Sequence, residues 1–142
     1  MKRVWKAKEV VKGWEGKPIR IQMANDPFDE DSDVEIRDMT VFGAMLVIAN
    51  NFACETLDDA SKKKSLKQTL KASLKSGLIE LEAETFKWLK NASEKVCPRA
   101  WQDNANEVHD IITEGYRKEN ELSKLQPKKK DKTDEAPVSE EK

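Results

Sequence analysis

Two cysteines and one histidine are the residues of this sequence best suited to nucleophilic or metal chemistry. Cys54 and Cys97 stand 43 positions apart without a CxxC pair, so they match neither a zinc ribbon nor a thioredoxin-like redox motif. His109 is the only histidine, and it forms a catalytic pair with Cys97 only if the fold joins them. A P-loop, GxGxxG and GxSxG are absent. We expect reduced cysteines in the core, no metal or other cofactor, and no enzyme activity.

An acidic loop at residues 25–33 is the nearest match to a cation site. Three of its aspartates have the i, i+2, i+4 spacing with which an EF-hand loop begins: Asp29, Asp31 and Asp33. The sixth position of that motif requires glycine but is Val34, and the twelfth requires glutamate but is Thr40. We therefore interpret the loop as a solvated segment that faces a partner, and leave open whether it binds a cation.

The formal net charge of −1 is the sum of opposed blocks. Residues 1–24 carry +5, residues 25–38 carry −6 and residues 61–77 carry +6. In the last block lysines recur every four residues, which predicts a stripe on one helix face: Lys63, Lys67, Lys71 and Lys75. Such a stripe can follow phosphates or meet an acidic protein, and it can equally be an ordinary solvated face.

Three aromatic residues complete the candidate contacts. Trp5 and Trp14 lie within the first basic block, and Phe28 lies in the acidic loop. Aromatic rings interleaved with lysines can stack on bases while the amines hold phosphates. The same rings can pack on a protein partner or inside the fold. The candidate partner-binding residues are Trp5, Trp14, Phe28, Lys63, Lys67, Lys71 and Lys75.

The elements that must position these residues begin with a predicted β-hairpin in residues 1–37. Apolar residues at 4–5 and 10–11 form one β-type run, and those at 19, 21 and 23 alternate in the next. Between them, residues 13–18 contain two glycines and a proline suited to a turn. A third short strand is predicted at 34–37, with Val34 and Ile36 on one face.

Helical spacing is predicted from residue 40 onward. A nearly all-apolar run at 41–49 indicates a buried helix capped by Thr40 or Asp38, too short at about 13 residues to span a bilayer. After an acidic connection at 54–60, a second helix is predicted over 62–76 with Gly77 as its C-cap. An extended segment at 78–81 leads to a third helix that ends at Pro98. A fourth helix follows, and its end beyond Gly115 is expected to project from the domain.

These elements predict an α+β fold, mainly helical, with two or three short strands packed on about four helices. Residues 1–126 form the single domain, of which 38–126 are the helical part, and the mixed-charge residues 127–142 are expected to be disordered. Five glycines and five prolines exclude a collagen-like chain. Because neither a transmembrane span nor a signal peptide is indicated, we expect a cytoplasmic protein.

Five short segments within roughly residues 16–112 follow one another in a recognisable order, at 16–19, 38–41, 79–84, 89–90 and 97–100. Together they resemble the corresponding segments of small accessory proteins of tailed bacteriophages and prophages. The acidic loop and the charged C-terminal residues depart from the family pattern. The resemblance implies an origin in a phage or prophage gene, a location in the host cytoplasm, no catalytic residues and no particular mechanism.

Two functions remain open from the sequence. The first is a non-enzymatic module that binds a host or phage protein, for which an exposed strand edge, the acidic loop or the lysine stripe is available. The second is a nucleic-acid-binding or transcription-modulating protein that uses the basic hairpin and the lysine-striped helix, although the adjacent −6 block would repel a duplex. The partner, the oligomeric state and the choice between virion assembly and host takeover are not determined by the sequence.

Overall fold

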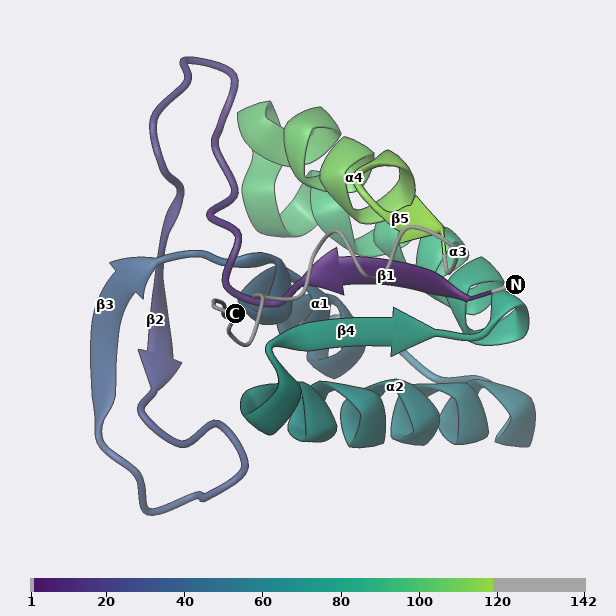
Figure 1. Cartoon of the computed structure of the whole chain (residues 1–142). Coiled ribbons are helices and arrows are strands. Elements are labelled where there is room, and N and C mark those ends of the chain that lie inside the picture. Colours follow the sequence, from purple (N-terminus) through teal and green to yellow (C-terminus); the bar gives the residue numbers. More distant parts are fainter. Residues whose placement is uncertain (1, 119–142) are drawn as a thin grey trace, which may run out of the picture.

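The structure, a computed structural model, describes residues 2–118 of the 142-residue chain. Within that range the fold is α+β and mainly helical (Figure 1). The elements are β1 (Arg3–Lys6), β2 (Arg20–Ala24), β3 (Val34–Asp38), α1 (Val41–Asn51), α2 (Leu57–Ser76), β4 (Leu78–Leu81), α3 (Ala83–Trp101), the 3₁₀ helix η1 (Gln102–Asn104), α4 (Ala105–Glu114) and β5 (Arg117–Lys118). The predicted tail at 127–142 lies outside the described residues.

β1 is the central strand of the larger sheet. It pairs antiparallel with β4 on one side and β5 on the other, with Trp5 opposite Ile79. The prediction that this strand forms a hairpin with residues 19–23 is therefore wrong. Val4 and Trp5 are consecutive and both are buried, so both faces of β1 must be covered. β1 is interior to its sheet because β4 and β5 pair with its two edges, and β4 is itself largely buried. β2 pairs instead with β3 in a separate two-stranded ribbon.

The predicted turn at 13–18 and the predicted third strand are both present. Gly13 N–H donates to the Lys17 carbonyl at 2.9 Å, and Gly16 takes a φ of +81°, which a glycine adopts without strain. Ile19 N–H then donates to the Val11 carbonyl at 3.0 Å. The chain thus reverses where expected, although regular strands do not extend from the turn on both sides.

Side-chain caps define the first two helices. Thr40 Oγ1 accepts from Gly43 N–H, which starts α1 as predicted. α2 begins earlier than the predicted residue 62 because Thr56 Oγ1 accepts from Asp59 N–H at 3.0 Å. Gly77 ends α2 with a φ of +79°, the left-handed C-cap that the sequence predicts.

The third helix does not end at Pro98 as predicted. α3 continues to Trp101, because the buried Val96 and Cys97 hold this turn against the core while Pro98 itself is exposed. The helix ends where Gln102 adopts a φ of +44°. The prediction that the chain projects from the domain beyond Gly115 is also wrong up to residue 118, because β5 pairs with β1.

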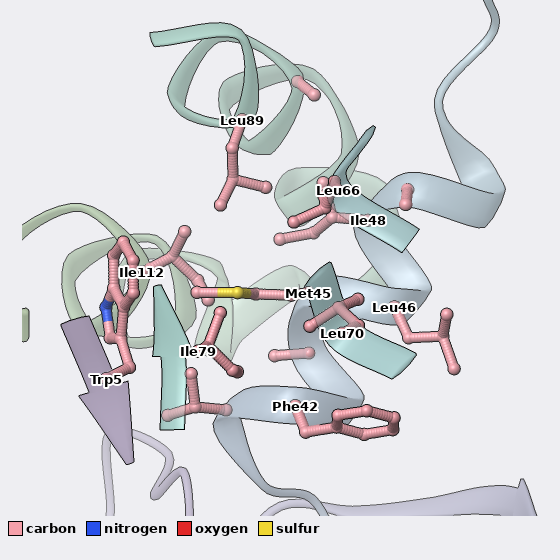
Figure 2. Close-up of a cluster of buried hydrophobic side chains, with 14 of the residues drawn as sticks. Trp5, Phe42, Met45, Leu46, Ile48, Leu66, Leu70, Ile79, Leu89 and Ile112 are labelled. Atoms are coloured by element: carbon pink, nitrogen blue, oxygen red, sulfur yellow. The ribbon is translucent and has the colours of Figure 1, made fainter. Parts of the chain in front are cut away.

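The core lies between the β4–β1 sheet and the helices, with α1 in the middle. The Met45 side chain extends from α1 across the centre of the cluster (Figure 2). Fully buried side chains from the other three α-helices and from β1 and β4 surround it: Trp5, Leu66, Leu70, Ile79, Leu89 and Ile112. Among the helices of residues 2–118, none has both the length and the apolar character needed to cross a membrane.

Two leucines of α2 allow a matched test of this core. Leu70 is fully buried, whereas Leu74, one turn later, is 54% exposed. We expect Leu70→Ala to lower the free energy of unfolding by about 2–5 kcal/mol through lost burial and a cavity. Leu74→Ala should change it by less than about 0.5 kcal/mol. Urea denaturation followed by circular dichroism measures both, and equal losses would contradict the assigned orientation of α2.

Candidate functional site

A groove between α2 and the acidic loop is the candidate functional site. Its volume is about 550 Å³, and it combines basic and apolar side chains. Four of the residues proposed as partner contacts from the sequence line it together. The lining residues, here called the lysine groove, are Phe28, Cys54, Ala60, Lys63, Lys64, Lys67, Gln68 and Lys71.

α2 positions the basic wall of the groove. Leu66 and Leu70 are buried against the core, so the helix turns the intervening lysines outward. Lys63, Lys67 and Lys71 follow one another at intervals of four residues, which are neighbouring positions on a helix face. The leucine side of the helix thereby determines where the ammonium groups point.

Phe28 contributes the apolar part of the opposite wall. Its ring packs edge-on against the Phe42 ring of α1, with 6.3 Å between centroids. The backbone N–H of Phe28 donates to Asp26 Oδ1 at 3.0 Å, and Asp26 N–H donates to Ser32 Oγ at 2.7 Å. These bonds within the acidic loop hold the ring at the groove, where it is half-buried.

The groove has an excess of unpaired positive charge. Within residues 2–118, its four lysines form no ion pair, whereas the neighbouring Lys62 pairs with Asp58 at 3.1 Å. In the acidic loop, Asp29 Oδ1 instead accepts from the backbone N–H of Asp31 at 2.9 Å. The groove can therefore attract an anionic group from outside the described chain.

Asp59 fixes the beginning of the helix that carries these lysines. Its carboxylate accepts from the backbone N–H of Glu55 at 3.0 Å and from Trp88 Nε1 of α3 at 3.1 Å. These hydrogen bonds, the Glu55 bond first, favour the charged form and hold the pKa of Asp59 below its ordinary value of 3.8. The carboxylate thus joins α2 to α3.

The other predicted contact residues lie outside the lysine groove. Lys75 is exposed further along α2. Trp14 is 61% exposed at the tip of the 13–18 turn, where its backbone N–H donates to Asn104 Oδ1 at 3.0 Å. Figure 1 shows this tip well away from α2. Trp5 is buried and donates from Nε1 to the Ile111 carbonyl at 3.2 Å, so its assignment to a partner surface is corrected to a core role.

The fold connects Cys97 to His109 through a residue that sequence reasoning missed. Ser93 Oγ lies 3.1 Å from Cys97 Sγ and 2.8 Å from His109 Nδ1, joining α3 to α4. Ser93 and Cys97 are buried, so neither can reach a substrate in this state. Burial raises the pKa of the Cys97 thiol, against the smaller lowering by its Ser93 hydrogen bond. The arrangement joins the two helices and presents no accessible nucleophile.

The two cysteines differ in accessibility, contrary to the expectation that both are in the core. Cys97 is buried, whereas Cys54 is exposed in the α1–α2 connection and lines the lysine groove. No group of three or more metal-ligating side chains converges within residues 2–118. The sequence places Cys54 in the acidic connection at 54–60, but only the return of the chain from α1 to α2 brings it beside the lysines.

Comparisons of the chain with models of protein families, with curated proteins and with solved structures found no match. The side chains that the fold brings together are therefore the basis for a functional proposal.

Thiol labelling tests the assigned exposure of the cysteines. Ellman's reagent at mildly alkaline pH should react quickly with Cys54 in the folded protein, and with Cys97 only after unfolding, because a buried thiol with a raised pKa supplies little accessible thiolate. The Cys54→Ser variant should therefore lose the fast phase. A fast phase of full amplitude in that variant would show that Cys97 is accessible.

The lowered pKa of Asp59 predicts a specific loss of stability in acid. Its contribution is fully present above the unfolded value near 3.8 and is lost as the pH falls through the lower folded pKa. Asp59→Asn should therefore lose less stability than the wild type between about pH 5 and about pH 2.5. Urea midpoints across this range provide the measurement. Asp110→Asn, which removes an exposed carboxylate of α4 that forms no ion pair within residues 2–118, is the control for the loss of one surface carboxylate.

Proposed function

We propose that this chain is a non-enzymatic protein-interaction module whose lysine groove binds an acidic segment of a partner protein. One observation carries the proposal: four lysines without ion pairs among the described residues line a single groove together with a half-buried phenylalanine. Unpaired ammonium groups attract carboxylates, and a partly exposed aromatic ring offers apolar contact area. A surface with both properties suits a segment with both acidic and apolar residues.

The spacing of the lysines supports a partner segment of defined length. Lys63 and Lys71 are two helical turns apart, so their α-carbons are separated by about 12 Å along the helix axis. Three or four residues of an extended acidic segment cover that distance. Because the lysines lie at the surface, their attraction should fall as salt screens the charges.

Two structural features favour a protein over a nucleic acid as the partner. Trp5 is buried, which removes one of the two tryptophans that base stacking on a basic hairpin would have used. In addition, Phe28 belongs to the acidic loop, whose carboxylates would repel the continuous phosphate chain of a nucleic acid more than a short acidic segment confined to the groove. Nucleic-acid binding, with a role in modulating transcription, is the alternative function.

The phage connection is a proposal that depends on the sequence resemblance alone. We propose that the module is an accessory protein of a phage or prophage and acts on a host or phage protein in the host cytoplasm. Gene order tests this proposal. Neighbouring structural genes would favour virion assembly, neighbouring early genes would favour host takeover, and the absence of phage genes would contradict it.

Charge reversal tests the lysine groove directly. The probe is a fluorescent peptide of about 12 residues in which glutamates alternate with leucine and phenylalanine, so that any three or four consecutive residues have the chemistry of the groove. We expect the Lys67→Glu/Lys71→Glu double variant to weaken peptide binding at least about tenfold, because two attractive contacts become repulsive. Fluorescence anisotropy at low salt measures the affinity.

A second pair of lysines provides the matched control. Lys87 and Lys90 are exposed on α3 outside the groove, so Lys87→Glu/Lys90→Glu changes the net charge equally and should alter binding less than about twofold. Equal weakening by both pairs, or no binding by the wild type, would contradict the groove. Tighter binding to a DNA duplex than to the peptide, with a steep salt dependence, would favour the nucleic-acid alternative.

A further inference from the structure

The outer edge of β3 has backbone groups that no described strand pairs. Asn25 N–H donates to the Asp33 carbonyl at 2.8 Å, and Met39 N–H donates to the Ile19 carbonyl at 2.6 Å. Hydrogen-bonded pairs alternate along an antiparallel ladder, so Glu35 and Arg37 direct their backbone groups to β2. The backbone groups of the residues between and beside them point outward: Val34, Ile36 and Asp38.

The same strand presents two apolar side chains to solvent. Val34 is 61% exposed and Ile36 is 62% exposed, and both lie on one face because strand side chains alternate. In Figure 1, β3 lies at the outer side of the ribbon, with β2 between it and the helices. An open edge with exposed β-branched residues is a template for another strand.

We propose that β3 pairs antiparallel with β3 of a second copy of this chain, centred on Ile36. In that register Ile36 lies opposite its own counterpart, and its outward backbone groups form a hydrogen-bonded pair across the two-fold axis. Glu35 lies opposite Arg37 of the second copy, and Arg37 opposite Glu35. The two ribbons thereby become one four-stranded sheet.

The charges of β3 select this register over its neighbours. Centring the pair on Glu35 would place two glutamates opposite each other, and centring it on Arg37 would place two arginines opposite each other. Only the register centred on Ile36 places Glu35 of each copy opposite Arg37 of the other, so that both of these cross-strand contacts are attractive. In the single chain, Glu35 Oε1 and Arg37 Nη2 are 3.2 Å apart on the same face, with both side chains partly exposed, so they can reach across the new strand pair.

The interface is small, so the dimer should be weak. Five residues a side form it, well below the size of a stable obligate interface, and we expect a dissociation constant of about 100 µM. The proposal is independent of the lysine groove, which lies on α2 and the loop before β3. Failure of one proposal therefore leaves the other intact.

Sedimentation velocity of the full chain over a concentration series is the first test. Ile36→Lys should abolish self-association, because the lysine of one copy would lie opposite the lysine of the other copy at the two-fold axis. Leu57→Lys, at an 88% exposed leucine on α2, is the control and should dimerise like the wild type. Glu35→Arg should weaken the dimer, and the double variant Glu35→Arg/Arg37→Glu should restore it because the opposite charges face each other again.

Disulfide trapping in the Cys54→Ser background tests the register. Residues at 36 in the two copies would be about 5.5 Å apart at Cα, within disulfide range, so Ile36→Cys should cross-link on mild oxidation. Residues at 34 would be about 13 Å apart, so Val34→Cys should not. A wild type that stays monomeric to about 1 mM, ten times the expected dissociation constant, would overturn the proposal, as would equal trapping of both variants or a charge swap that fails to rescue.

Discussion

The structure depends on the requirement that β1 be covered on both faces. Val4 and Trp5 are adjacent and buried, so this strand has no polar side to turn toward water. β4 and β5 pair with its two edges, and core side chains pack around it, with the Trp5 ring near Phe86 and Tyr116. Because β1 belongs to that sheet, β2 cannot use it as a partner and pairs with β3 alone. The unpaired ribbon edge follows directly from this arrangement.

The same burial orients α2. This helix packs Leu66 and Leu70 toward the core beside β4, and its lysines are left on the outer side. Asp59 and Thr56 hold the first turn in place through backbone and Trp88 hydrogen bonds. A rigid helix then fixes the backbone positions of the four lysines, so that only their side chains remain to be ordered when a partner binds.

Charge is distributed over the surface so that neighbouring elements differ in sign. The acidic loop borders the lysine groove through Phe28, yet its carboxylates bond to the loop's own backbone, as Asp26 and Asp29 do. The basic groove consequently keeps its charge, and the two signs lie side by side. A partner with carboxylates and an apolar residue would satisfy this surface better than a uniform polyanion, since the loop repels anions that extend beyond the groove.

By itself, the sequence determined the mainly helical α+β class, a capped start of α1 at Thr40 or Asp38, the C-cap of α2 at Gly77, the third strand and the alternation of charge blocks. Each of these depends on spacing or on a cap within a few residues. Only the tertiary structure decided that Trp5 is buried opposite Ile79, that Phe28 and Cys54 meet the α2 lysines, and that Ser93 lies between Cys97 and His109. Local periodicity shows which face of an element is apolar. Which elements pack their apolar faces against one another depends on burying all of these faces in one core. No signal between residues close in the sequence specifies that packing.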